Sequence, residues 1–161
     1  VDLDFFGNRP FEAQEIQDLL IELRPISVIS KSKNILILNV QEVKVDFVNY
    51  RYPLIAEPVL EEGLRLLNIK DVGAMKLGAI TGRGRKRDFY DLYFLLEKLS
   101  LQELIDLYNK KYDDGSEFLV VRSLTYFEDA ETDADPKLLN DAVDWETVKS
   151  KIRKEVKQLY N

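Results

Sequence analysis

The spacing of apolar residues changes once along this chain, near residue 70, from the period of strands to that of helices. Four segments before this point show strand patterns rich in Val and Ile or alternating in polarity: 1–6, 27–30, 34–40 and 43–50. A helix is predicted after the first of them, over 12–23, and Pro25 ends its pattern. The other three segments predict an antiparallel meander, closed by Pro53 and Pro58.

Helical spacing dominates the rest of the chain. Helices are predicted over 71–80, 88–99, 101–112 and 145–159, with Asp71, Ser100 and Asp144 as N-caps. The segment 117–127 fits a helix slightly better than a strand, and 128–144 is predicted to be an acidic loop. The sequence therefore predicts an α/β or α+β protein, in which 1–69 forms the sheet part and 70–161 a helical domain.

The amino-acid composition excludes several kinds of chemistry. The 161 residues include no Cys and no His, which excludes disulfides, a thiolate nucleophile, a zinc site of the usual ligands and a Ser/His/Asp triad. Catalysis would have to use carboxylates, Lys, Arg, hydroxyls or a hard metal ion. The longest aliphatic run, Ile35 to Leu38, is far too short to span a bilayer, and no signal peptide opens the chain. We therefore expect a cytoplasmic protein without a membrane partner.

Acidic residues are concentrated in one region. The net charge is −6, which taken globally argues against a general nucleic-acid binder. The segment 113–146 holds eleven acids against Arg122 and Lys137, a local charge of −9, so the remainder of the chain carries +3. The average charge therefore hides a basic remainder.

Three carboxylates lie in strand-like segments. Asp2 and Asp4 are two residues apart, so both point to the same face of a strand. Such a pair either meets water at a strand end or requires a cation, for which Mg²⁺ is the natural candidate. Asp46 occurs in a second apolar strand, and on a neighbouring strand it would add a third metal ligand. The alternative is a salt bridge from Asp46 to a surface base.

A basic segment lies between two predicted helices. Residues 82–87 place four bases among two glycines, which predicts a flexible loop able to contact phosphates or a solvated turn. Asp88 and Asp91 follow on one side of their helix. Asp88 is either an N-cap with Asp91 as a first-turn acid, or the two acids hold Lys76, Arg83 or Arg87 towards a cleft. We also predict that Lys76 and the basic segment border the cleft of the carboxylates.

Four separated segments carry a family resemblance: VDLDFF, VKVDFVNYRYPLI, DVGAMKLGAITGRGRKRDFYDLYFLL and SLTYFEDAETDADPKLL. In order and spacing they resemble the AbiEii/AbiGii-type toxin family of nucleotidyltransferases. The resemblance implies a polymerase-β-like nucleotidyltransferase fold, a mixed sheet followed by a helical half, of which 1–69 would be the C-terminal part of the sheet core. It also implies transfer of a nucleotide from a nucleoside triphosphate to an acceptor such as tRNA, within a toxin-antitoxin or phage-defence pair.

The resemblance further implies roles for individual residues. Asp2 and Asp4 would hold Mg²⁺ or Mn²⁺, with Asp46 at the position of a third metal ligand. Lys76 matches a motif lysine that contacts the triphosphate. Independently of the resemblance, Arg83, Arg85 and Arg87 of the basic segment are expected as further phosphate contacts, because a triphosphate needs cationic neighbours. Asp88 and Asp91 match the last acidic motif. These carboxylates and Lys76 are the expected catalytic set.

The resemblance also implies a Gly-Gly or Gly-Ser element upstream of the Asp2 strand, where backbone N–H groups bind the triphosphate. Because the chain opens at Val1, we expect the native start to lie further upstream and the 161 residues alone to bind nucleotide weakly. The alternative function is a non-catalytic module of the same fold that binds a partner protein or nucleic acid through the acidic stretch 113–146. Triphosphate-dependent stabilisation would distinguish the two.

Overall fold

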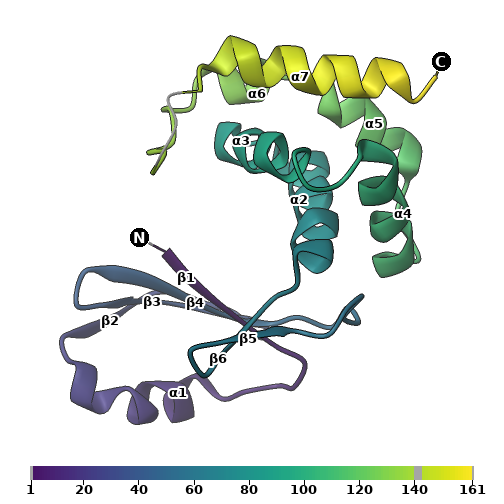
Figure 1. The fold of residues 1–161 in the computed structure, drawn as a ribbon. Coiled ribbons are helices and arrows are strands. Elements are labelled where there is room, and N and C mark those ends of the chain that lie inside the picture. Colours follow the sequence, from purple (N-terminus) through teal and green to yellow (C-terminus); the bar gives the residue numbers. More distant parts are fainter. Residues whose placement is uncertain (1, 140–142, 161) are drawn as a thin grey trace. The chain divides into compact units, whose positions relative to one another are not determined.

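The first part of the chain folds around a four-stranded sheet in the computed structural model, which describes residues 2–139 and 143–160 (Figure 1). The chain forms two compact units, Val1–Pro53 and Leu54–Asn161, and each is described by itself. The elements of the first unit are β1 (Asp2–Gly7), α1 (Ala13–Leu19), the 3₁₀ turn η1 (Ile21–Leu23), β2 (Ile26–Lys31), β3 (Ile35–Val40) and β4 (Val43–Asn49).

The sheet is mixed, with the strand order β1-β4-β3-β2. β2, β3 and β4 pair antiparallel, which confirms the predicted meander. β1 pairs parallel to β4 and forms an edge of the sheet. A parallel pair needs a crossover between its strands, and α1 with the rest of the meander provides it.

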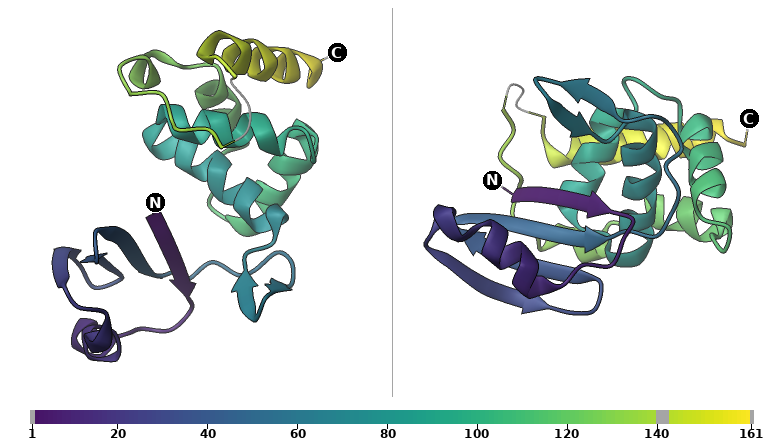
Figure 2. Two further views of the ribbon diagram at one scale, coloured as in Figure 1. Left: turned by 60° about the vertical axis from the view of Figure 1, so that its left-hand side comes forward. Right: turned by 90° about the horizontal axis from the view of Figure 1, so that it is seen from below.

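The alternation of buried and less buried residues along β3 shows which face of this sheet is covered. Leu36, Leu38 and Val40 are buried, and they pack in one cluster with Ala13 and Ile16 of α1. Their neighbours in sequence therefore lie on the opposite face. α1 runs along the covered face in two of the views (Figures 1 and 2).

A hairpin that the sequence analysis did not predict opens the second unit. β5 (Val59–Glu61) and β6 (Leu64–Leu66) pair antiparallel across Glu62 and Gly63. Both turn residues have positive φ, 48° and 81°, as a tight two-residue hairpin turn requires. A Glu-Gly pair between short apolar runs was the available signal, and Pro58, which was predicted to close the strand region, directly precedes the hairpin.

Six helices make up the rest of the described part of the second unit: α2 (Ile69–Arg83), α3 (Lys86–Leu95), α4 (Leu101–Lys111), α5 (Glu117–Leu124), α6 (Glu128–Glu131) and α7 (Trp145–Gln158). Ser100 and Asp144 cap their helices as predicted. Asp71 does not, because α2 begins earlier and Asn68 is its N-cap. The ambiguous segment after residue 117 is helical, and the predicted acidic loop contains the short α6.

The core of the second unit joins α2, α3, α4, α5 and α7. Its largest fully buried side chain is Phe89, whose ring lies 5.0 Å from Phe127 and 5.7 Å from Trp145 between ring centroids. Gly73 faces Leu104 between α2 and α4, where a Cβ atom would clash, so a glycine permits this close approach. α7 lies across the outside of this bundle (Figures 1 and 2). No helix of the described residues is long and apolar enough to cross a membrane.

Candidate functional site

The three strand carboxylates lie on one face of the first unit's sheet. In the parallel pairing of β1 with β4, Asp2 is opposite Lys44 and Asp4 is opposite Asp46. Register partners on adjacent strands share a face, so these four side chains form one charged patch on the face that α1 does not cover. The predicted adjacency of Asp46 to Asp2 and Asp4 is confirmed. Asp2 and Asp4 are both exposed.

Asp46 already has a cationic partner on this face. The Lys44 Nζ donates to both carboxylate oxygens of Asp46 at 2.6 Å. The two side chains are 38% and 18% exposed, respectively, so the pair is partly shielded from water. This ion pair is the alternative that the sequence analysis left open for Asp46.

Two basic residues of α2 converge on one buried carboxylate of α3. Asp88 has no exposed side-chain surface and accepts from Lys76 at 3.2 Å and from Arg83 at 2.8 and 2.9 Å. Lys76 also pairs with the half-exposed Asp91 at 2.6 Å. Asp88 is not an N-cap, because α3 begins earlier, with Arg85 as its N-cap. The alternative that Asp88 and Asp91 hold Lys76 and Arg83 therefore fits this geometry.

The electrostatics of Asp88 follow from these contacts. Burial alone raises the pKa of the Asp88 carboxyl, but hydrogen bonding and charge from Arg83 and Lys76 outweigh it, so the pKa lies below the usual value of 3.8. Asp88 is therefore ionised at neutral pH. Because its side chain is fully buried, its effect on any ligand would pass through Lys76 and Arg83.

The predicted basic loop is a tight connection rather than a flexible segment. Gly82 and Arg83 end α2, Gly84 adopts the left-handed conformation at φ 52°, and Lys86 already begins α3. Only Gly84 and Arg85 lie between the two helices. The prediction of a flexible loop was wrong, because the helical hydrogen bonding of both neighbours extends into it.

The same basic segment is bound by the acidic stretch of the chain. Asp133 accepts from the Arg85 guanidinium at 2.9 Å and from the Lys86 backbone N–H at 3.0 Å, and Asp135 pairs with the Lys86 Nζ at 3.2 Å. These contacts lower the pKa of Asp133, first of all the backbone hydrogen bond from Lys86. These contacts were not predicted from the sequence, although the opposite charges of segments 82–87 and 113–146 were a signal for such pairing.

Trp145 anchors the acidic stretch beside these pairs. Its indole N–H donates to Glu131 at 3.0 Å, and the Lys86 and Lys149 ammonium groups lie 5.5 and 5.4 Å from its ring centroid. Lys149 also pairs with Glu131 at 2.7 Å. Part of the acidic stretch is therefore neutralised within the second unit.

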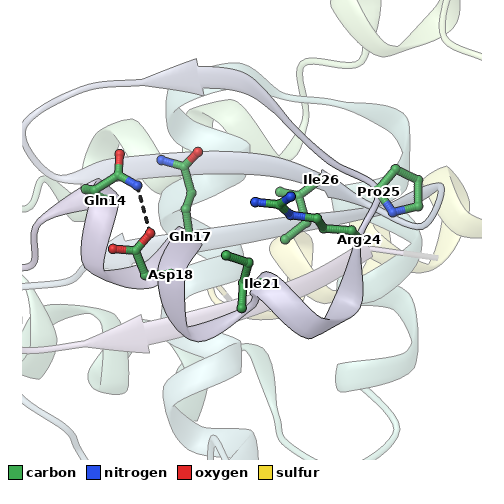
Figure 3. Close-up of a pocket in the computed structure, with 7 residues that line it drawn as sticks. All are labelled: Gln14, Gln17, Asp18, Ile21, Arg24, Pro25 and Ile26. Atoms are coloured by element: carbon green, nitrogen blue, oxygen red, sulfur yellow. Dashed lines mark hydrogen bonds between the residues drawn. The ribbon is translucent and has the colours of Figure 1, made fainter.

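A groove in the first unit is separate from the carboxylate patch. It lies along α1 and η1 and the turn before β2 (Figure 3), and its lining residues are Gln14, Gln17, Asp18, Ile21, Arg24, Pro25 and Ile26. Since α1 covers the other face of the sheet, this groove is not next to Asp4.

Comparison with known proteins decides the family. Residues 1–158 match the family described as "Nucleotidyl transferase AbiEii toxin, Type IV TA system". The chain belongs to the AbiEii nucleotidyltransferase toxin family. It is also 36% identical over 167 residues to the Aquifex aeolicus (strain VF5) protein named "Uncharacterized protein aq_aa25", covering 98% of this chain and 78% of that protein.

Two solved structures share the AbiEii chain's fold. The crystal structure of JHP933 from Helicobacter pylori has a TM-score of 0.55 and 20% identity, covering 99% of this chain and 75% of that one. A second H. pylori protein, provisionally named a nucleotidyltransferase, gives a TM-score of 0.55 at 19% identity, covering 99% and 77%. The expected fold, a nucleotidyltransferase-like mixed sheet followed by helices, is confirmed.

The divalent metal that the AbiEii family implies can be tested against the residues present. Asp2 and Asp4 are exposed residues on one strand face, and carboxylate oxygens are donors that Mg²⁺ and Mn²⁺ prefer. Across residues 2–139 and 143–160, no three acidic side chains are arranged to hold a metal, and Asp46 is paired with Lys44. The donor set therefore fits a metal held by two carboxylates and completed by ligand oxygens or water.

The bases predicted to contact phosphate all belong to the second unit, and all have partners within the AbiEii chain. Paired with carboxylates are Lys76, Arg83 and Arg85. Arg87 is exposed and also has an interaction partner. Lys76 is 24% exposed, so it is not buried in the helical core. Its contact with a triphosphate stays a prediction, as do the phosphate contacts of the three arginines.

Replacing Asp88 should cost more stability than replacing Asp91, although both pair with Lys76. We expect Asp88→Asn to lower the free energy of unfolding by about 2 kcal/mol, because two cations lose a fully buried partner. Asp91→Asn should cost about 0.5 kcal/mol or less, since Asp91 is half-exposed. Urea unfolding followed by tryptophan fluorescence measures both, and equal costs would contradict a larger contribution of the buried ion pairs of Asp88.

Proposed function

We propose that this chain is a metal-dependent nucleotidyltransferase that moves a nucleotide from a nucleoside triphosphate to an acceptor such as the end of a tRNA. Membership of the AbiEii family supports nucleotidyl transfer in a toxin-antitoxin context. The observation that carries the proposal is the exposed pair of Asp2 and Asp4 on one strand face, beside Asp46. We further propose that the protein acts in the cytoplasm, as the toxin of a pair with an antitoxin and in phage defence.

The carboxylates of the first unit would hold the metal. Asp2 and Asp4 would bind Mg²⁺ or Mn²⁺, which would neutralise and orient triphosphate oxygens when bound. Asp46 would accept a proton from the acceptor hydroxyl or serve as a third metal ligand, and either role requires its oxygens to exchange the Lys44 ammonium for a new partner. Lys44 would then be able to contact a phosphate oxygen on the same face.

In the second unit, Lys76 would neutralise charge on the triphosphate, with Arg83, Arg85 and Arg87 as further phosphate contacts. Asp88 would act as a positioning residue, because its carboxylate is buried beneath Lys76 and Arg83. Asp91 would limit the mobility of the Lys76 side chain from the solvent side.

One observation weighs against a non-catalytic module that binds partners through the acidic stretch 113–146. Glu131, Asp133, Asp135 and Glu146 pair with bases of the same unit. A partner would have to break these ion pairs to use the same carboxylates. The acidic stretch is therefore better explained as part of the structure of the second unit.

Stabilisation by a nucleotide tests the proposal. The protein, with whatever residues its gene encodes ahead of Val1, should melt at a higher temperature with Mg²⁺ and a nucleoside triphosphate than with either alone. Each of the four nucleotides is tried separately, with EDTA as the metal control. Identical melting temperatures in every condition would contradict nucleotide binding, and a shift without transfer to tRNA would point to the binding-module alternative.

A further inference from the structure

The outer side of α7 is basic, although the chain as a whole has a net charge of −6. Val148, Ile152 and Val156 are buried along one side of the helix, and the opposite side carries Ser150, Arg153, Lys154 and Lys157, all exposed. The four exposed positions have the i, i+3, i+4, i+7 spacing of a single helix face. We name Arg153, Lys154 and Lys157 the basic face of α7.

Carboxylates neutralise the basic segment at the start of α3, but two residues of the basic face have no such partner. Within residues 2–139 and 143–160, neither Arg153 nor Lys154 takes part in an ion pair. Glu146 at the start of α7 is paired with Lys149, and Glu155 lies on another side of the helix. The charges of Arg153 and Lys154, both exposed, are therefore directed to solvent.

An aromatic ring holds one cation of the basic face in place. The Arg153 guanidinium lies 5.0 Å from the centroid of the buried Phe127 ring. A ring attracts a cation without accepting conventional hydrogen bonds in its plane, so the outward N–H donors stay available to an anion. This contact also reduces the side-chain entropy that binding through Arg153 would otherwise cost.

We propose that the basic face of α7 binds the phosphate backbone of RNA. Three cations in one row on a rigid helix match a ligand with regularly spaced phosphates better than a single small anion. The choice of RNA as ligand rests on the proposed function. The assignment of this surface rests on the charge, exposure and ring contacts of α7.

The test compares two variants of equal net charge. The first, Arg153→Gln/Lys154→Gln/Lys157→Gln, removes the basic face, and the second, Lys70→Gln/Lys98→Gln/Lys110→Gln, removes three exposed lysines elsewhere in the same unit. Glutamine is a good helix former, so α7 should stay folded in the first variant; the second variant has no substitution in α7. Binding of bulk tRNA is measured from 50 to 300 mM salt for both variants and the parent.

We expect the first variant to bind tRNA roughly a hundredfold more weakly at 0.1 M salt, with a slope of log K against log salt smaller by about 2 to 3. The control variant should keep the parent slope. Equal losses in both variants, an unchanged slope in the first, or no tRNA binding by the parent would each overturn the proposal. Preference of the parent for anionic lipid vesicles over tRNA would overturn it as well.

Failure of this inference is separable from failure of the proposed function. The Mg²⁺-nucleotide melting shift should be the same in the parent and in the Arg153→Gln/Lys154→Gln/Lys157→Gln variant, because the basic face makes no part of the carboxylate patch. If the parent protein binds tRNA but shows no melting shift with Mg²⁺ and nucleotide, the result counts against the proposed nucleotidyl transfer alone. An intact shift with unchanged tRNA binding in the variant would count against the basic face alone.

Discussion

Replacing Asp4 with Asn should reduce nucleotide transfer at least about a hundredfold, because it removes one of the two carboxylates that can hold the metal ion. Asp4 is exposed at the edge strand, so the substitution should leave the melting temperature in the absence of nucleotide nearly unchanged. The rise in melting temperature with Mg²⁺ and nucleotide should disappear. Transfer of a labelled nucleotide to tRNA and the melting shift are measured on the same preparations.

Two variants sharpen this expectation. Asp114→Asn, at another exposed aspartate in the connection between α4 and α5, should change neither measurement. Asp46→Asn tells the two interpretations of Asp46 apart: a loss as large as that of Asp4→Asn indicates a metal ligand or base, and a loss below about tenfold indicates that its pairing with Lys44 is structural. Undiminished transfer by Asp4→Asn would remove the β1 carboxylates from the site.

The largest effect on stability is expected at the buried pair of Asp71 and Lys111. Neither side chain has exposed surface, and their 2.7 Å ion pair joins α2 to α4. Asp71 also accepts from the backbone N–H groups of Ile55 and Ala56 at 3.0 to 3.2 Å. Lys111→Met should lower the free energy of unfolding by about 3 to 5 kcal/mol, because it leaves a buried carboxylate without its counter-charge.

The neighbouring lysine provides the control. Lys110 precedes Lys111 on the same helix but is exposed, so Lys110→Met should change the free energy of unfolding by about 0.5 kcal/mol or less. The chain's one tryptophan, Trp145, lies in the second unit, so its fluorescence in urea follows the unfolding of that unit. Similar midpoints for the two variants would show that the buried pair contributes little.

The same pair predicts how stability depends on pH. Burial alone raises the pKa of Asp71, but the hydrogen bonds from Lys111, Ile55 and Ala56 outweigh it and hold the pKa below 3.8. Because the folded-state pKa is the lower one, this contribution is present above the unfolded pKa of about 3.9 and is lost as the pH falls through the folded value. Stability should therefore drop below about pH 4, and less steeply in Asp71→Asn.

Local pattern was enough to determine much of the fold. The alternation in β3 and the i, i+2 spacing of Asp2 and Asp4 depend only on the geometry of a strand, so the meander and the shared face of the two carboxylates were predictable. Likewise, Ser100 and Asp144 cap their helices through bonds that span three residues. The four motifs also predicted the family, which the match over residues 1–158 shows.

Contacts between distant residues required the tertiary structure. Asp71 has the sequence signature of an N-cap, but its partner Lys111 lies 40 residues away, and only the packing of α2 against α4 brings them together. Asp133 and Arg85 are 48 residues apart, and no local pattern fixes which acid reaches which base. Short-range periodicity therefore determined the helices and strands. The packing of the helices decided which residues form ion pairs, because electrostatic attraction does not depend on a fixed spacing in the sequence.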